Sequence, residues 1–208
     1  MTNKKTIILG NGGHAAVLTE ILLQQNVNIL GYTAPEKEKN PFDLNYLGDD
    51  EIILRFKPSD VQLVIGIGML APHSLKKKIY ERFKSLGFCF NNVIHSAAIV
   101  SPYAKLGEGV QIMAGAIIQI GCSIADNTII NTGAIVDHDC QVGKHIHIAP
   151  GVKISGAVTI RDNTHIGTGA TIIQGISVGE NCLIAAGAVV VKDIYNDKVV
   201  KGIPAKEV

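Results

Sequence analysis

Aliphatic residues recur at every sixth position through the second half of the chain. The series runs without a gap and consists of Ile94, Val100, Leu106, Ile112, Ile118, Ile124, Ile130, Val136, Val142, Ile148, Ile154, Ile160, Ile166, Ile172, Val178, Ile184 and Val190. Four positions after each comes a residue that is usually small or β-branched, such as Ala116, Cys122 or Thr128. A period of six fits neither the 3.6-residue turn of an α-helix nor a row of hairpins, and is typical of a parallel β-helix built from hexapeptides.

Three hexapeptides per turn would give a triangular solenoid in which residues eighteen apart stack on neighbouring coils. Each coil would add ~4.8 Å if coils pair as strands do. Side chains alternate along a strand, so the periodic aliphatic residue and the small residue two before it point inward. This stacking predicts that Gly156 lies directly above His138, so that bare backbone covers the imidazole. It also predicts that His147 and His165 share a column.

The same arithmetic places Ile99, Ile117 and Ile135 in one outward apolar column. Exposed apolar surface of this kind indicates a contact with another chain, so we expect the column to be buried against a second subunit. Three of the four cysteines fall in the inward small position, and there is no CxxC pair, so we interpret all four as buried packing residues.

Composition excludes several classes of protein. The formal net charge is +1, which provides no bulk attraction to nucleic acid or to anionic lipid. The longest apolar runs are too short to cross a bilayer, and the first residues lack the pattern of a secretory signal. The sequence therefore predicts a cytoplasmic protein that binds neither nucleic acid nor membrane.

Residues 1–93 follow different rules from residues 94–208, and we expect two domains with these boundaries. KTIILG, NVNILGY and VQLVIGIG are predicted strands, whereas GNGGHAAVLTEILLQQ and APHSLKKKIYERFKSLG are predicted helices. We expect the basic face of the second helix to be solvated. Alternating strands and helices predict an α/β domain, a small Rossmann-like parallel sheet with crossover helices.

The first predicted strand ends in a glycine turn. Gly10, Gly12 and Ala15 match G-x-G-x-x-A, and the amides at the start of the following helix favour a phosphate. A dinucleotide site would require an acidic residue near the end of the second strand, but Tyr32 and Thr33 stand there. The turn therefore predicts binding of a nucleotide through its diphosphate rather than a nicotinamide redox role.

A cluster of histidines lies in the stretch NTGAIVDHDCQVGKHIHIAPG. His138 lies between Asp137 and Asp139. A histidine has an unperturbed pKa of ~6.5, so it can accept a proton near neutrality, and a neighbouring carboxylate can select its tautomer. We predict that His138 is a general base, with a corner histidine bonded to a backbone carbonyl as the alternative. Which aspartate orients it stays open at this point.

Other polar residues of the cluster have weaker indications. We expect His145 to face solvent from a turn, and the stacking of His147 on His165 could be purely structural. Asn131 is a candidate to orient the acceptor or a thioester, although Asn is also an ordinary turn residue at a corner.

The main alternative to a site in which His138 acts as a general base is a zinc lyase built on the same type of solenoid. Such hexapeptide carbonic anhydrases join three histidines across subunits, two of them in an H-x-x-x-x-H arrangement. The intervals from His138 to the following histidines are seven, nine and twenty-seven, so this spacing is missing. We therefore predict no metal. A purely structural or regulatory solenoid is a further alternative.

The turn GNGGHA, the hexapeptide series, the stretch INTGAIVDHDC and the terminal GIPAK together resemble the sialic-acid O-acetyltransferase family of hexapeptide acyltransferases. The resemblance is greatest to its N-acetyltransferases of nucleotide-linked 4-amino-6-deoxy sugars, of the bacillosamine and perosamine type, which serve bacterial glycan biosynthesis. It covers nearly the whole chain. It implies a left-handed β-helix, acetyl-CoA as co-substrate and direct transfer to the sugar amine.

The resemblance also implies roles for individual positions. His138 would be the base, and Asp139 would raise its basicity. The acetyl-CoA contacts would be His147, Gly156, Thr168 and Ala186. The nucleotide sugar would rest on Gly12, Gly13, His14, Tyr32, Thr33 and Gly68. The resemblance further implies a homotrimer with active sites between subunits.

Two questions stay open from the sequence. The acceptor could instead be a hydroxyl of a sialic-acid-type sugar. The nucleotide base could be uracil or guanine, and the sugar stereochemistry is undetermined.

Overall fold

The computed structural model describes residues 4–69 and 75–208. Within these ranges the chain folds as two compact units. One unit contains residues 4–68 together with Leu75–Val93, and the other contains Met69 and Ile94–Val208. No helix in the described ranges is long and apolar enough to cross a membrane.

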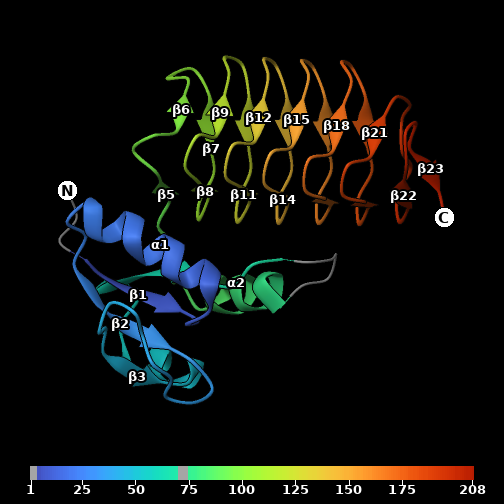
Figure 1. The fold of residues 1–208 in the computed structure, drawn as a ribbon. Helices are drawn as coiled ribbons and strands as arrows, with labels where there is room; N and C mark the ends of the chain where they lie inside the picture. Colours follow the sequence, from blue (N-terminus) through green and yellow to red (C-terminus); the bar gives the residue numbers. More distant parts are fainter. Residues whose placement is uncertain (1–3, 70–74) are drawn as a thin grey trace. The chain divides into compact units, whose positions relative to one another are not determined.

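The first unit contains a four-stranded parallel sheet with the order β3-β2-β1-β4 (Figure 1). Its elements in chain order are β1 (Lys5–Leu9), α1 (Gly13–Gln24), β2 (Ile29–Thr33), β3 (Tyr46–Gly48), the 3₁₀ helix η1 (Asp50–Arg55), β4 (Val61–Ile65) and α2 (Leu75–Ser85). Ile7 and Leu63 of the central strands are buried in one cluster with Phe83 of α2. The predicted alternation of strands and helices is confirmed.

Strand β3 and helix η1 are not part of the sequence prediction. β3 has three residues, too few to show a period, and joins the sheet by pairing Tyr46 with Tyr32 and Gly48 with Thr33 of β2. Gly31 permits this close approach, because a Cβ on it would lie 2.3 Å from the carbonyl oxygen of Asn45. Because β3 pairs with β2, the helix η1 that follows β3 lies at the end of β2, where Asp50 of η1 contacts Thr33.

The expectation of a fully solvated basic face on α2 is wrong for one residue. Lys76 is buried, with 2% of its surface exposed. Burial penalises the charged ammonium and lowers the pKa of Lys76 to about 7. Arg82 behaves differently, since its guanidinium lies 2.7 Å from the Glu51 carboxylate in an exposed ion pair.

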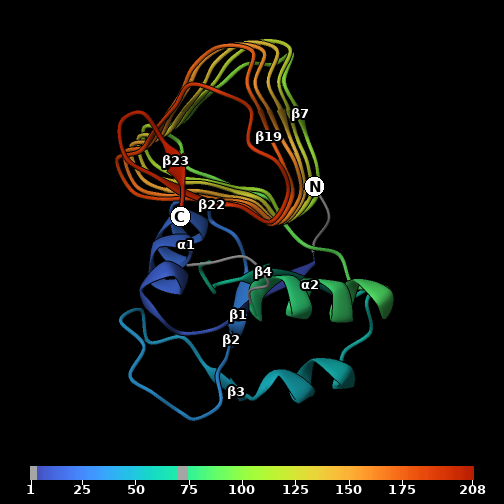
Figure 2. The ribbon, with the colours of Figure 1, turned by 90° about the vertical axis from the view of Figure 1, so that its right-hand side faces the viewer.

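The second unit is the predicted solenoid, and Figure 2 shows its coils stacked around a triangular cross-section. One side contains β7 (Lys105–Leu106), β10 (Ser123–Ile124), β13 (Gln141–Val142), β16 (Thr159–Ile160) and β19 (Ser177–Val178). The second contains β6 (Ile99–Val100), β9 (Ile117–Ile118), β12 (Ile135–Val136), β15 (Lys153–Ile154), β18 (Thr171–Ile172) and β21 (Val189–Val190). The third contains β5 (Val93–Ile94), β8 (Gln111–Ile112), β11 (Ile129–Ile130), β14 (His147–Ile148), β17 (His165–Ile166), β20 (Leu183–Ile184), β22 (Val199–Lys201) and β23 (Lys206–Glu207).

Each strand from β5 to β21 ends on one of the periodic aliphatic residues, as the hexapeptide pattern predicts. Neighbouring coils pair in parallel at a separation of eighteen residues, for example Ser123 with Gln141 and His147 with His165. The periodic residues and the small residues between them form one continuous buried core. The predicted fold and register are confirmed.

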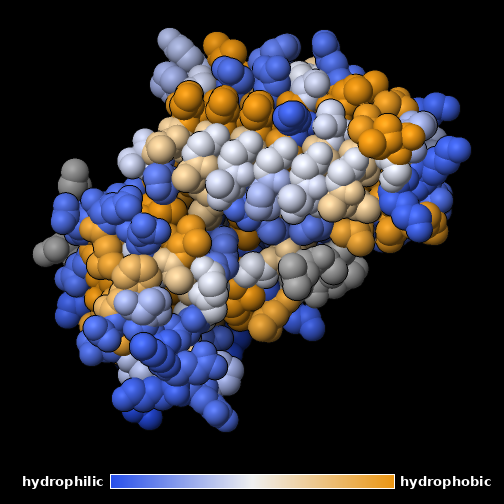
Figure 3. Space-filling model, viewed as in Figure 1, coloured by the Kyte–Doolittle hydropathy of each residue, from blue (hydrophilic) through white to orange (hydrophobic). Residues whose placement is uncertain are grey.

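An apolar column on the second side is confirmed as well. Ile99, Ile117 and Ile135 pair with one another along β6, β9 and β12, and Figure 3 shows apolar side chains over these strands. Ile99 is 65% exposed in the single chain. The column ends at β15, where Lys153 follows Ile135.

The cysteines divide into two groups. Cys122, Cys140 and Cys182 are buried in the core of the solenoid, as predicted. Cys89 is exposed, so the prediction is wrong for this residue, which lies outside the hexapeptide pattern.

Candidate active site

His138 lies in the turn that joins β12 to β13, and its ring contacts one of the two flanking aspartates. Its Nδ1 lies 2.9 Å from Oδ2 of Asp139. Asp137 instead accepts a hydrogen bond from the backbone N–H of His138 at 2.7 Å. The structure therefore resolves the question that the sequence left open, because Asp139 is the residue that orients the imidazole.

The pair is arranged so that one ring nitrogen is available. An ionised carboxylate only accepts hydrogen bonds, so Nδ1 must carry the proton that it donates to Asp139. Nε2 then presents a lone pair, and it has no hydrogen-bond partner among the described residues. The side chain of His138 is 48% exposed. An accessible imidazole with a free lone pair can act as a base.

Neighbouring groups raise the pKa of His138 above its ordinary value. The main cause is the hydrogen bond that Nδ1 of His138 donates to Asp139, and the charges of Asp137, Asp139 and Cys122 act in the same direction. Partial burial acts in the opposite direction. The raised pKa makes this imidazole a stronger proton acceptor than an isolated histidine.

Gly156 lies one coil beyond His138, as the eighteen-residue period predicts. A Cβ on Gly156 would lie 2.6 Å from both Cε1 and Nε2 of His138, so the ring rests directly against the glycine backbone. The Gly156 N–H donates no hydrogen bond within the described chain. An unused backbone amide in the glycine that the ring contacts can bind an oxyanion.

His147 and Asn131 form a second polar pair on the third side of the solenoid. The amide nitrogen of Asn131 lies 3.0 Å from Nε2 of His147, and Nδ1 of His147 lies 2.6 Å from the carbonyl oxygen of Met69. Both ring nitrogens are thus already hydrogen-bonded within the chain, and the ring is 8% exposed. The pair lies on the third side of the solenoid, whereas His138 lies in the turn between the second and the first side.

His165 stacks on His147 with the rings 5.0 Å apart at 79°, an edge-to-face contact. It is 8% exposed, and its Nδ1 has no hydrogen-bond partner among the described residues. Burial lowers the pKa of His165, with the backbone of Met69 acting in the opposite direction. The ring is therefore neutral near pH 7.

Two of the positions predicted to contact acetyl-CoA lie at another corner of the solenoid. Thr168 and Ala186 occupy exposed turn positions on successive coils, after β17 and β20. They are not brought next to His138.

His145 is buried, so the prediction that it faces solvent is wrong. Its Nδ1 lies 2.8 Å from the amide nitrogen of Asn127 on the preceding coil.

The glycine turn of the first unit opens α1. Gly12 is the N-cap residue with an extended backbone, and Gly13 begins the helix without an acidic residue in its first turn. Gly12, Gly13 and Gly68 are exposed, and no atom of residues 4–69 or 75–208 lies within 4 Å of a Cβ placed on any of them. His14 is partly buried beside them. The turn therefore has open backbone of the kind that accepts a phosphate.

Tyr32 and Thr33 at the end of β2 are both buried. The Tyr32 hydroxyl donates to the carbonyl of Glu38 at 2.7 Å. The Thr33 hydroxyl donates to Oδ1 of Asp50 at 2.5 Å. Asp50 therefore supplies a carboxylate at the end of the second strand, where the sequence alone showed none.

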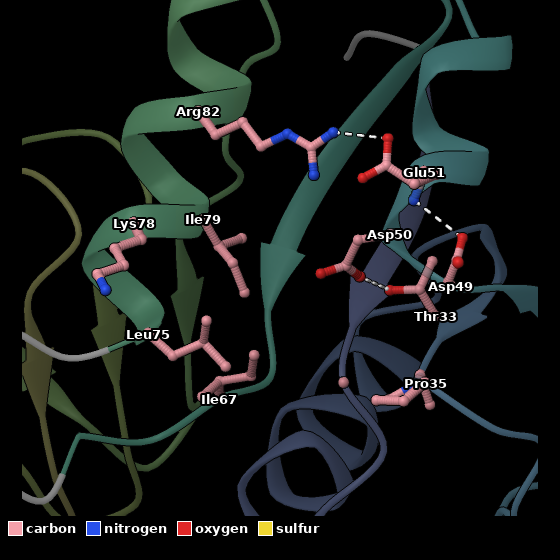
Figure 4. A pocket seen from close by; sticks show the side chains of 12 residues that line it. Thr33, Pro35, Asp49, Asp50, Glu51, Ile67, Leu75, Lys78, Ile79 and Arg82 are labelled. Atoms are coloured by element: carbon pink, nitrogen blue, oxygen red, sulfur yellow. Dashed lines mark hydrogen bonds and ion pairs between the residues drawn. The ribbon is translucent and has the colours of Figure 1, made fainter.

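A cavity of about 530 Å³ opens at this edge of the sheet (Figure 4). Its lining residues are Gly10, Thr33, Ala34, Pro35, Asp49, Asp50, Glu51, Ile67, Leu75, Lys78, Ile79 and Arg82. It lies at the carboxyl ends of β1, β2 and β4, where parallel α/β sheets bind ligands. Figure 4 shows the Asp50 carboxylate and Thr33 on one wall, with apolar Ile67 and Ile79 facing them.

Sequence reasoning missed Asp50 as a residue of this cavity. The acidic run Asp49, Asp50 and Glu51 is visible in the sequence, but its position depends on β3 pairing with β2. Within the run Asp49 caps η1, since its Oδ1 accepts from the Glu51 amide at 3.1 Å, and Glu51 pairs with Arg82.

A solenoid of hexapeptides that carries an oriented histidine against a bare glycine defines a hexapeptide acyltransferase. Residues 5–83 match the PglD N-terminal domain family, and residues 157–192 match the bacterial transferase hexapeptide family. The chain belongs to the family of hexapeptide acetyltransferases that carry a PglD-type N-terminal domain. The predicted resemblance is confirmed.

Two solved structures of this family match almost the whole chain. The acetyltransferase domain of PglB from Neisseria gonorrhoeae is 32% identical with a TM-score of 0.91, covering 99% of this chain and 100% of that one. It has also been solved in complex with acetyl coenzyme A. A histidine-to-asparagine variant of perosamine N-acetyltransferase from Caulobacter crescentus, in complex with CoA and GDP-perosamine, is 33% identical with a TM-score of 0.90, covering 98% of this chain and 96% of that one.

A curated relative matches over a shorter stretch. UDP-N-acetylbacillosamine N-acetyltransferase from Bacillus subtilis (strain 168) is 36% identical over 116 residues, which span 53% of this chain. The match spans about half of that relative, 52% of its length.

Proposed function

We propose that this protein transfers an acetyl group from acetyl-CoA to the amine of a nucleotide-linked 4-amino-6-deoxy sugar. The observation that carries the proposal is the His138 imidazole, held by Asp139 at 2.9 Å and resting on Gly156 with its Nε2 free. The relatives named for perosamine and N-acetylbacillosamine support this substrate class. The proposal keeps the cytoplasmic location and the role in glycan biosynthesis that the sequence predicts.

The chemistry is a direct transfer. The amine nitrogen attacks the thioester carbonyl carbon while Nε2 of His138 takes a proton from that nitrogen. The carbonyl oxygen becomes an oxyanion, to which the N–H of Gly156 donates. The carbon–sulfur bond then breaks, and the CoA thiolate leaves and takes the proton from the imidazolium. A positioned base contributes about 10²- to 10⁴-fold, and a single oxyanion donor about 10²- to 10³-fold.

Asp139 has a defined part in this reaction. Its carboxylate keeps the proton on Nδ1, so that the lone pair stays on Nε2, and it stabilises the imidazolium that forms during transfer. It does not take the proton itself. The raised pKa of His138 is consistent with this part.

The nucleotide is proposed to bind the first unit. Gly12, Gly13 and Gly68 would hold the diphosphate together with His14, because the backbone of these three glycines is open and α1 begins at Gly13. The cavity beside Thr33 would take the nucleoside, with Asp50 accepting hydrogen bonds from it. Tyr32 would support the cavity from behind its lining residues, since its hydroxyl donates a hydrogen bond to the Glu38 carbonyl.

Acetyl-CoA is proposed to contact His147, Gly156, Thr168 and Ala186. Thr168 and Ala186 are exposed on successive coils, whereas the ring nitrogens of His147 are hydrogen-bonded to Asn131 and Met69. In this arrangement His147 and Asn131 would offer ring and amide surface rather than a free nitrogen. A homotrimer with active sites between subunits completes the proposal, and the apolar Ile column supports it.

The test is acetyl-CoA consumption with a panel of UDP- and GDP-4-amino-6-deoxy sugars, with free sialic acid as the alternative acceptor. We expect turnover with one of the nucleotide amino sugars and a loss of at least about a hundredfold in His138→Ala. Turnover with sialic acid alone would replace N-acetylation by O-acetylation. Near-normal turnover in His138→Ala would overturn the assignment of the base.

A further inference from the structure

One corner column of the solenoid carries residues with left-handed backbone on four successive coils. They are Gly121, Asp139, Ala157 and Gly175, with φ of 77°, 61°, 56° and 73°. The coils are tied here by hydrogen bonds from the amide of Asp139 to the carbonyl of Ile120 and from the amide of Ala157 to the carbonyl of His138, at 3.0 and 2.8 Å. Asp139, the partner of His138, therefore stacks directly on Gly121.

The stacking leaves no room for a side chain at position 121. A Cβ on Gly121 would lie 2.3 Å from Oδ1 of Asp139 and 3.2 Å from its Cγ. The other carboxylate oxygen, Oδ2, is the atom that contacts Nδ1 of His138. The carboxylate is thus held between the bare α-carbon of Gly121 and the imidazole.

Backbone conformation alone does not explain the glycine. Ala157 occupies the same column with φ of 56°, so the corner accepts a methyl group. Gly175 has nearly the same φ as Gly121, and no atom lies within 4 Å of a Cβ placed on it. What distinguishes Gly121 in this column is the carboxylate above it.

We infer that Gly121 is a positioning residue of the acetyl-transfer site, whose missing side chain lets Asp139 reach Nδ1 of His138. The inference rests on the proposed function of His138 as the base. Gly121 contacts Asp139, and Gly156 contacts the His138 ring, so a glycine lies against each member of the His138–Asp139 pair.

The experiment compares Gly121→Ala with Gly175→Ala, which carries the same backbone strain in the same column without a contact to the carboxylate. The primary measurement is the pKa of His138 by NMR titration of the full-length protein without substrate, with the signal assigned by its loss in His138→Ala. We expect Gly121→Ala and Asp139→Asn to lower the pKa of His138 and Gly175→Ala to leave it unchanged. The charges of Asp137 and Cys122 also act on His138, but these residues are unchanged in all three variants.

Turnover gives the second measurement, with the amino sugar that the acceptor panel identifies. We expect Gly121→Ala to lower kcat about ten- to a hundredfold with little change in either KM, and to add nothing further in an Asp139→Asn background. An unchanged His138 pKa in Gly121→Ala would overturn the inference. An equal loss in Gly175→Ala would also overturn it, since strain alone would then be the cause.

A replacement variant and a measurement that does not depend on turnover distinguish a failure of this inference from misfolding and from a failure of the proposed function. If Gly121→Ala does not fold, Gly121→Asn replaces it, because asparagine already adopts this left-handed conformation at positions 127 and 163. If His138 is not the base, His138→Ala retains turnover, but the NMR titration still reports whether Gly121 positions Asp139.

Discussion

The imidazole of His138 lies directly against the α-carbon of Gly156, where a Cβ would come within 2.6 Å of Nε2. The two residues are eighteen apart in sequence, one coil of the solenoid, and the hydrogen bond from the Ala157 amide to the His138 carbonyl holds the coils together at this point. The relationship brings the bare backbone of Gly156 against a ring nitrogen, and neither that nitrogen nor the Gly156 N–H has a hydrogen-bond partner among the described residues.

Gly156→Ala should lower kcat about a hundredfold, because the methyl group would displace the imidazole. Gly156 is not in the left-handed region, so its backbone accepts alanine without strain. Steady-state kinetics on the nucleotide amino sugar would measure the loss, and the midpoint of thermal unfolding would verify that the fold persists. A near-normal kcat would show that the ring does not act from this position.

The acid limb of the pH profile should move when Asp139 is replaced. The base works in its neutral form, so kcat/KM falls as pH drops through the pKa of His138. Asp139 raises that pKa, and Asp139→Asn should therefore shift the acid limb to lower pH while also lowering the plateau. A profile of kcat/KM between about pH 5 and 9 would check both effects. A limb that stays in place would indicate that Asp139 does not set the basicity of His138.

Asp50→Asn should weaken binding of the nucleotide sugar by about tenfold, which corresponds to ~1.4 kcal/mol. Asparagine can still accept from Thr33, so the structural contact survives while the negative charge is lost. The expected signature is a raised KM for the sugar with the KM for acetyl-CoA unchanged. Glu81→Gln, an exposed change on α2, is the matched control. Equal effects on both KM values would argue against a nucleoside site in this cavity.

His165→Phe should stabilise the fold by about 1 kcal/mol, because it removes a buried nitrogen without a partner and keeps a ring beside His147. Burial lowers the pKa of His165, so the folded state binds fewer protons than the unfolded state as pH falls below the unfolded value of ~6.5. The gain should therefore grow below about pH 6.5.

Urea unfolding of both proteins at fixed protomer concentration would measure this difference. His147→Phe is the contrasting variant, since it removes hydrogen bonds to Asn131 and Met69 and should destabilise. A loss of stability in His165→Phe would mean that Nδ1 has a partner in solution.

Ile117→Glu should convert the proposed trimer to monomers, because it places a charge in the middle of the apolar column that would lie at the subunit contact. Light scattering on the purified protein would give the mass. Leu54→Glu serves as control, since Leu54 is also an exposed apolar residue, at 51%, but lies outside the column. A trimer that survives Ile117→Glu would place the interface elsewhere.

The solenoid could be predicted almost residue by residue, whereas the first unit could not. The period of six by itself predicts the position of every strand from β5 to β21 and the pairing of His138 with Gly156. In the first unit the strands β1, β2 and β4 were predicted, but β3 was not, and with it the position of Asp50 was missed. A three-residue strand has no period, so its partner is chosen only by the folded chain.

The sequence by itself determined the coils, the core and which residues stack, because a strict repeat converts a difference in residue number directly into a position in space. Only the tertiary structure decided that Asp139 rather than Asp137 contacts the imidazole, that Asp50 meets Thr33, and that Lys76 and His145 are buried. These outcomes depend on side-chain rotamers and on contacts between segments that share no period, and such contacts form only when the whole chain has folded.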